Sequence, residues 1–244
     1  LYNRFYSLEE VAEKINKEYA FSLVPSTIKR WIDDFKDRIT FVRMREFIQN
    51  KIAKKEIKKR EVIVESRMFH GQIYEYRYHR EKTNCILDES FKHFGFKPLQ
   101  EFLELVIAEC PHQVFMNKTH RASELKNTFE LKGVKITPKD NTAVRTTKFV
   151  LQAVSNNKRR HSALQEYMIA NDSVTVATEI PVLLDYDDLF HYRKVLGFDV
   201  PLECAEGEVC TGHIDFLQIR NGSVHILDYK PNAHKARPID QLTL

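Results

Sequence analysis

The chain has 244 residues, of which 43% are hydrophobic, and this is enough for a packed core and excludes a chain that is disordered throughout. Lysine and arginine number 38 against 34 acidic residues, so the net charge of +4 is uninformative as a total. No run is long and apolar enough to cross a bilayer, and no secretory signal opens the chain. The four cysteines form no CxxC pair, so we expect a reduced, cytoplasmic protein without a membrane partner.

Residues 1–40 are expected to form a helical module. Ser7 and Glu10 have the spacing of a capping box, which predicts a helix from residue 8. Pro25 starts a second helix, with Lys29 and Arg30 on its basic outer face. Its expected apolar stripe consists of Ile28, Trp31, Ile32 and Phe35.

This second helix resembles the DNA-contacting half of a helix-turn-helix motif. The segment that links the two helices, residues 16–24, is long for that motif. An ordinary helical hairpin is therefore the alternative interpretation.

Residues 41–145 form a basic, mixed region whose role the sequence does not reveal. Residues 41–62 are expected to be one basic helix, because residues 41–60 carry eight lysines and arginines against two glutamates. Such a face contacts phosphates or is simply solvated. The candidates for phosphate contact are Lys54, Lys55, Lys58 and Lys59.

A hairpin that turns at His70-Gly71 is expected within residues 62–80. Its alternating Tyr74, Tyr76 and Tyr78 could stack on bases or form one packed face of a sheet. A helix follows Pro98, and its inward side chains are expected to be Leu99, Phe102, Leu103 and Val106. Residues 111–142 show no regular period.

From residue 146 the pattern is that of an α/β core with a mixed sheet. We expect a helix over residues 146–170, a buried strand over 174–184 and an acidic loop over 185–210. Residues 212–230 then form a hairpin, because Asn221-Gly222 separates two apolar, alternating runs. A final helix is expected around Pro238.

The hairpin brings Asp215 near Asp228 and Lys230 at its open end. Two carboxylates offer the oxygen ligands that Mg²⁺ or Mn²⁺ prefers. An adjacent ammonium can orient an attacking water and stabilise the charge that develops on a phosphoryl group. The alternative is an ordinary ion pair between Asp228 and Lys230, since Asp-x-Lys is common by chance.

Four motifs in order extend this pattern through residues 150–244. They are His161 with Leu164 on a helix, Gly212 with Asp215, Asp228 with Lys230, and Gln241 at the start of the last helix. Together they resemble the PD-(D/E)xK nuclease superfamily, and within it the RecB-like branch. The resemblance implies a restriction-endonuclease-like core, a mixed central sheet flanked by helices, over residues 146–244 after a mostly helical N-terminal region.

The resemblance also implies a metal ligand on the helix before the strands. His161 is favoured through a neutral imidazole, and Glu166 competes, because five residues of helix place the two on different faces. Glu179 is either a third acidic group or a residue at the edge of the sheet. His213 is expected on the opposite face of the strand from Asp215, in a structural role.

Further site residues by the same resemblance are Gln241 and Tyr229, with Arg159 and Arg160 among the DNA contacts. The family has a tyrosine four residues after the glutamine and a strand after that helix. We therefore expect native residues beyond Leu244.

The leading hypothesis is a Mg²⁺- or Mn²⁺-dependent deoxyribonuclease with an N-terminal DNA-binding part. The second is a non-catalytic subunit that positions DNA in a recombination, repair or transposition complex, beside a helicase, recombinase or transposase. A nuclease that processes RNA is the third. The sequence contains no P-loop, so any helicase activity would come from another chain.

Overall fold

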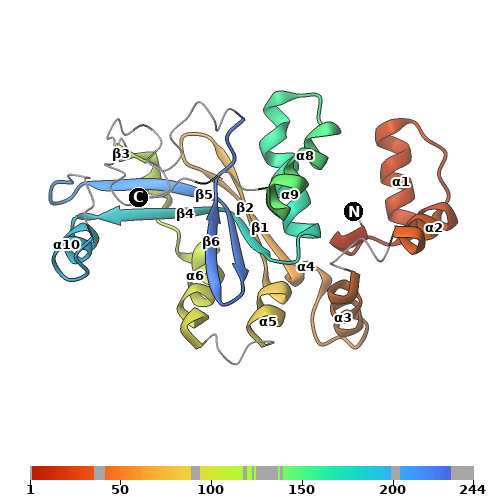
Figure 1. Cartoon of the computed structure of the whole chain (residues 1–244), viewed down its shortest axis with the longest axis horizontal. Helices are drawn as coiled ribbons and strands as arrows, with labels where there is room; N and C mark the ends of the chain where they lie inside the picture. The colour runs from red at the N-terminus through yellow and green to blue at the C-terminus, as the bar shows by residue number, and fades with distance from the viewer. Residues whose placement is uncertain are drawn as a thin grey trace.

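A computed structural model describes residues 2–35, 42–88, 94–117, 120–122, 124, 137, 140–198 and 204–231 of the chain. Within these ranges the protein is mixed α/β, with a six-stranded sheet flanked by helices (Figure 1). The strands are β1 (Ile63–Phe69), β2 (Ile73–His79), β3 (His120–Arg121), β4 (Thr175–Asp185), β5 (Val209–Arg220) and β6 (Ser223–Leu227).

The order of the strands is β1-β2-β4-β5-β3, and β6 pairs with β5. Every pair is antiparallel except β3 with β5, which is parallel. The predicted α/β class with a mixed sheet is thus confirmed. The sheet is continuous across the boundary expected at residue 146, because β2 pairs with β4 through Arg77↔Thr178 and Tyr78↔Ala177.

The helices fall before, between and after the strands. They are α1 (Leu8–Tyr19), α2 (Pro25–Phe35), α3 (Val42–Ala53), α4 (Lys59–Val62), α5 (Arg80–Asp88), α6 (Lys97–Glu109), α7 (His112–Met116), α8 (Thr142–Gln152), α9 (Arg160–Asn171) and α10 (Tyr186–Lys194).

The N-terminal module is the expected pair of helices. The capping box at the start of α1 is present, with the Ser7 hydroxyl accepting from the Glu10 N–H. The helix runs to Tyr19, so the link to α2 is shorter than predicted, and the Asn16 side chain bonds both backbone groups of Leu23 across it. Trp31 was expected in the apolar stripe of α2, and this is wrong, because its side chain is 42% exposed. The buried contact of α2 with Val11 and Ala12 of α1 is made by Ile28.

The predicted basic helix over residues 41–62 is wrong as a single element. It consists of α3 and α4 with an irregular segment between them, where Lys55 has a φ of +60°. The break lets Ile48 of α3 and Val62 of α4 enter one small core with Phe5. The packing of apolar side chains, and not the pattern of charges, thus determines where the helix breaks.

Both predicted hairpins are confirmed. The first turns at His70–Gln72 between β1 and β2, and the second turns at Asn221-Gly222, where both residues have positive φ as a type I′ turn requires. Tyr76 and Tyr78 are fully buried in the core of the sheet, so they are packing residues and are not available to stack on bases.

The two faces of the sheet carry separate cores. Leu103 and Val106 of α6 pack on one face with Leu217 and Ile219 of β5. On the other face, α8 and α9 pack against Phe216 through the buried Val150, Leu164 and Met168. Figure 1 shows α6 and the α8–α9 pair on opposite sides of the long strands. Phe102 on α6, expected inside, is 44% exposed.

Two further expectations between residues 146 and 210 are corrected. The single helix over 146–170 is α8 and α9, separated by residues 153–159, where the Asn156 side chain caps a short 3-10 turn, Asn157–Arg159. The acidic segment 185–210 contains α10, which Asp185 caps through the Asp188 N–H. In both places a local side-chain cap starts a new element.

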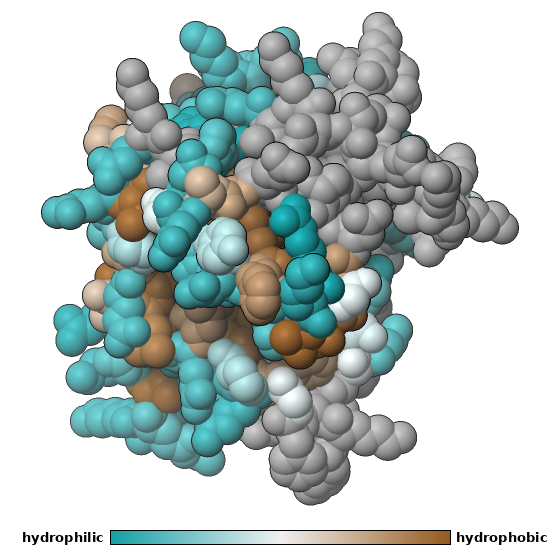
Figure 2. Space-filling model, turned by 90° about the vertical axis from the view of Figure 1, so that its left-hand side faces the viewer, coloured by the Kyte–Doolittle hydropathy of each residue, from teal (hydrophilic) through white to brown (hydrophobic). Residues whose placement is uncertain are grey.

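The end of the molecule at α10 presents hydrophobic side chains among hydrophilic ones (Figure 2). Exposed large apolar residues there are Tyr186, Phe190, Val195, Leu196 and Phe198. Among the described helices, none has both the length and the apolar character needed to cross a membrane.

Candidate active site

The β5–β6 hairpin places the two predicted aspartates next to each other. Phe216 pairs with Leu227, so the register sets Asp215 opposite Asp228 just where β6 ends. The backbone N–H of Tyr229 donates to Asp215 Oδ2 at 2.8 Å, which fixes the carboxylate against the returning chain. The convergence expected from the sequence is therefore present.

Asp228 and Lys230 lie side by side after the end of β6. Lys230 Nζ is 3.2 Å from Asp228 Oδ1, with the Asp228 side chain 7% exposed and that of Lys230 35% exposed. Lys230 lines the same cavity as Asp215, and Asp215 also lines a second cavity together with Asp228. The ammonium thus faces solvent while its partner is enclosed.

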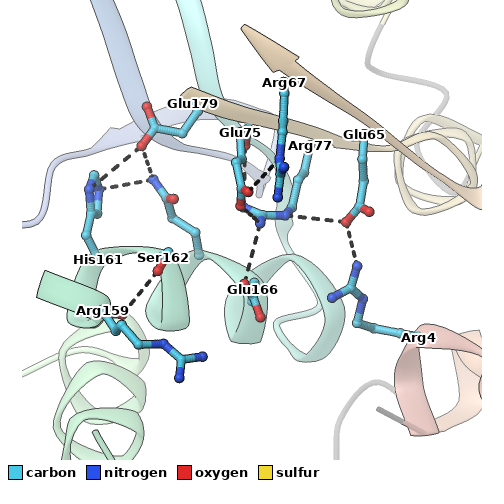
Figure 3. Close-up of polar contacts among 11 residues, drawn as sticks. Arg4, Glu65, Arg67, Glu75, Arg77, Arg159, His161, Ser162, Glu166 and Glu179 are labelled. Atoms are coloured by element: carbon cyan, nitrogen blue, oxygen red, sulfur yellow. Dashed lines mark hydrogen bonds and ion pairs between the residues drawn. The ribbon is translucent and has the colours of Figure 1, made fainter. Parts of the chain in front are cut away.

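His161 joins this pair from α9. Its Nε2 lies 3.1 Å from Asp215 Oδ2, and its Nδ1 lies 3.7 Å from Glu179 Oε1 on β4. One possible ligand atom from each of His161, Glu179 and Asp215 lies within 4.8 Å of the other two. Figure 3 shows His161 and Glu179 pointing toward one another.

Gln165 holds this arrangement in place. It is buried one helical turn after His161, on the same face of α9, and its Nε2 donates to Glu179 Oε1 at 2.7 Å. The same nitrogen lies 3.0 Å from His161 Nε2.

Glu166, the competing candidate, points elsewhere. Its side chain is 47% exposed and lies 3.5 Å from Arg77 Nη2, on the part of α9 turned toward β2 (Figure 3). His161 and Glu166 therefore do lie on different faces of the helix, and the structure brings only His161 to Asp215.

Glu179 has an unusual backbone for a residue in a strand, with φ +52°. It sits between the pairs Thr178↔Phe216 and Ile180↔Ile214, opposite Asp215 and in an interior strand. It is therefore not at an edge of the sheet. A left-handed non-glycine residue costs free energy, and such residues concentrate at functional sites.

The alternation of β5 is interrupted at the same level. Ile214 and Leu217 both pack on the α6 face, whereas Asp215 meets His161 of α9 and Phe216 packs beneath α9. Two consecutive residues thus face α9, as in a bulge that redirects a side chain. The irregularity places Glu179 and Asp215 on one face, under His161.

The neighbouring strands also separate here. On its edge away from β4, β5 pairs with β3 at Cys210 and Thr211, and with β6 from Phe216 onward. Among the described residues, no strand pairs with 212–215 along that edge. The site lies in this gap between β3 and β6.

The donor set fits a divalent cation. Glu179 Oε2 and Asp228 Oδ2 are buried, and within the described part of the chain neither accepts a hydrogen bond. Burying a carboxylate oxygen without a partner is costly. Three carboxylates and one imidazole around such atoms would match the oxygen-rich coordination of Mg²⁺ or Mn²⁺.

The pKa values of these groups are shifted by their mutual contact. Burial raises the pKa of Asp228, and the charge of Asp215 raises it further. Burial opposes ionisation of Asp215 too, but its contact with His161 and the Tyr229 N–H hold its pKa below the usual value. Burial would lower the pKa of His161, yet Asp215, Glu179 and Asp228 together raise it. Burial is also the main cause of the raised pKa of Glu179.

A cavity of about 550 Å³ opens above these residues. Lys158 from the 3-10 turn before α9 and Ser162 from the first turn of α9 line it together with Lys230. His213 lines it as well, but its ring stacks on Tyr74, which packs with the core on the α6 face, whereas Asp215 meets His161 of α9.

The other predicted contacts to DNA are at the surface. Lys29, Arg30, Lys54, Lys55, Lys58, Lys59 and Arg159 are exposed, and Arg160 is half-buried. Three of the lysines have acidic neighbours: Lys29 lies 2.8 Å from Asp33, Lys58 3.5 Å from Glu61, and Lys59 3.5 Å from Glu10.

The Arg159 side chain points away from the His161–Glu179 pair (Figure 3). Gln241 and the helix expected around Pro238 lie outside the described residues.

Sequence reasoning missed Gln165 and Lys158 and left Glu179 undecided. The spacing of four residues between His161 and Gln165 is a signal that could have identified the first. Comparison of the chain with models of protein families, with curated proteins and with solved structures finds no match.

Proposed function

We propose that the chain is a divalent-metal-dependent deoxyribonuclease with a PD-(D/E)xK core of the RecB-like kind. The observation that carries the proposal is the meeting of His161, Glu179 and Asp215 beside the Asp228–Lys230 pair. Mg²⁺ or Mn²⁺ would be held by Asp215, Glu179, His161 and Asp228, and when bound it would supply Lewis acidity toward a phosphodiester and its attacking water.

The chain's own residues would divide the remaining work. Lys230, which lines the cavity and is held by Asp228, would orient the attacking water and stabilise the negative charge that grows on the phosphoryl oxygens. The attacking water gives up a proton as its oxygen forms the new bond to phosphorus, the bond to the leaving oxygen breaks, and the leaving oxygen takes up a proton, so the protons balance. Lys158 adds a second ammonium on the cavity wall where a backbone phosphate would lie.

DNA is the proposed partner on electrostatic grounds. The exposed lysines between α3 and α4, and Lys29 with Arg30 on α2, offer phosphate contacts without base reading. A partner-dependent or non-catalytic subunit that positions DNA for a helicase, recombinase or transposase is the alternative. The buried carboxylate oxygens of Glu179 and Asp228 that have no hydrogen-bond partner among the described residues favour the enzyme, because a site that only positions DNA has no need of them.

The test is cleavage of labelled linear, circular and branched DNA by the purified chain with Mg²⁺, Mn²⁺ or EDTA. Wild type is expected to cleave with metal and not with EDTA, and Asp215→Asn is expected to bind the same DNA without cleaving it. Asp187→Asn, an exposed aspartate on α10, is the matched control and should cleave like wild type. DNA binding without cleavage of any substrate by wild type would favour the assembly role instead.

A further inference from the structure

A second cluster of potential ligands lies beside the cavity, where the β1–β2 turn meets the junction of α6 and α7. His70 follows β1, Cys110 ends α6, and His112 is the first residue of α7. His70 Nε2 lies 2.8 Å from His112 Nδ1 and 3.9 Å from Cys110 Sγ. The three ligand atoms are all within 4.8 Å of one another.

These separations are close to those that a tetrahedral zinc ion imposes. Zinc–nitrogen and zinc–sulfur bonds of roughly 2.0–2.3 Å place neighbouring ligand atoms roughly 3.3–3.6 Å apart. The observed distances lie on either side of that interval. A shift of about half an ångström in these side chains, of which that of His112 is exposed, would bring the ligand atoms to the separations that a zinc ion requires.

The backbone that carries His70 is fixed in place. Gly71 has φ +79°, and a Cβ at this position would lie 2.5 Å from Arg121 Nη2. That guanidinium donates to the carbonyl oxygen of His70. Because the turn is held by β3, the imidazole is presented to Cys110 and His112 at little cost in conformational entropy.

The donors differ in kind from those at the candidate active site. Imidazole nitrogen and thiolate sulfur suit Zn²⁺, whereas carboxylate oxygen suits Mg²⁺ and Mn²⁺. We propose that His70, Cys110 and His112 form a separate zinc site with three protein ligands and a fourth position open to water. The proposal does not depend on nuclease activity.

His213 completes the surroundings of this site from β5. Its Nε2 lies 2.8 Å from His70 Nδ1, the nitrogen on the far side of the ring from Cys110. His70 bound through Nε2 carries its proton on Nδ1 and donates it to His213, as ligating histidines do with outer partners. Tyr74 stacks on His213 with ring centroids 3.5 Å apart and fixes its orientation.

The protonation states agree with this role. Burial, with the nearby His112 and Arg121, lowers the pKa of His70 to about 4, so its ring is neutral near pH 7. Burial raises the pKa of the Cys110 thiol, which an ion would deprotonate on binding. The competing arrangement is a ladder of neutral imidazoles joined by hydrogen bonds, which would bind no ion.

Cobalt substitution distinguishes the two arrangements. The purified full chain, stripped of metal, is titrated with Co²⁺ alone. The expected result is a thiolate-to-cobalt charge-transfer band together with the intense visible bands of four-coordinate cobalt, both removed by Zn²⁺. Zn²⁺ should also raise the melting temperature of wild type.

The variants assign the signal to residues. Cys110→Ser and His112→Ala should lose the charge-transfer band and show a smaller thermal shift than wild type, and His112 is exposed, so that variant should fold. Cys85→Ser removes another half-buried thiol, and His161→Ala removes the candidate active-site ligand; both should keep the band. His213→Ala should weaken Zn²⁺ affinity on the order of 10–100-fold. A wild type without the band, or a Cys110→Ser that retains it, would overturn the zinc site.

Discussion

His161 Nε2 on α9 lies 3.1 Å from Asp215 Oδ2 on β5, while Glu166 of the same helix lies beside Arg77. Only His161 of these two side chains therefore lies at the proposed metal site. Because their partners differ, His161 and Glu166 can be tested against each other as metal ligands.

His161→Ala is expected to weaken Mn²⁺ affinity by more than roughly 10-fold, since even the outer partners of metal ligands contribute roughly 10–100-fold. Glu166→Ala should leave affinity unchanged, because its carboxylate contacts Arg77 outside the site. Calorimetric titration of both variants with Mn²⁺ measures this directly. Equal loss in the two would show that the metal is not held through His161.

The hairpin and its two aspartates could be predicted because their signals are local. Asn221-Gly222 sets the turn, and the register then follows by counting residues, so Asp215 opposite Asp228 required no tertiary information. The helix of the N-terminal capping box and the β1–β2 hairpin were predictable for the same reason.

The remainder of the site depends on contacts that no local pattern encodes. The left-handed Glu179 and the interruption at Asp215 arise from strand pairing in the folded sheet, and period-two counting would place these side chains differently. The break between α8 and α9, by contrast, has a local signal in the Asn156 cap, which the prediction of one continuous helix overlooks. At Glu179 and Asp215, local propensity gives way to tertiary packing.

Metal affinity should depend on pH through His161. The acidic neighbours outweigh burial and raise the pKa of His161 above its ordinary 6.5, and a metal must displace the proton to reach the ring. Mn²⁺ affinity is therefore expected to be highest above that raised pKa and to fall as the pH drops through it. Calorimetry at a series of pH values checks the profile. In His161→Ala the fall in Mn²⁺ affinity around the pKa of His161 should disappear. A pH profile unchanged by the substitution would contradict His161 as a metal ligand.

The strained backbone at Glu179 predicts a difference between two substitutions. Glycine adopts φ +52° without the steric cost that alanine shares with other L-residues. Glu179→Gly should therefore be more stable than Glu179→Ala by about 1 kcal/mol, while both lose Mn²⁺ binding. Urea unfolding of the metal-free variants measures the difference. Thr178→Gly against Thr178→Ala is the matched control in the same strand, and there alanine should be the more stable. Equal stability of the two Glu179 variants would mean that the residue is not strained in solution.

Lys230→Arg separates a catalytic lysine from one that only pairs with Asp228. The ion pair at 3.2 Å is partly exposed, so a guanidinium could replace the ammonium as a partner with little change in stability. Arginine is planar, bulkier and not readily deprotonated, and it cannot take the place of an ammonium that positions a water at close quarters. We expect Lys230→Arg to keep the fold, Mn²⁺ affinity and DNA binding but to cleave roughly 10²-fold more slowly or worse. Single-turnover cleavage, with Lys158→Arg as the control for a lysine that only contacts phosphate, measures the effect. If Lys230→Arg cleaves at the wild-type rate, Lys230 serves the ion pair alone, and the activation of water must come from another group in the cavity.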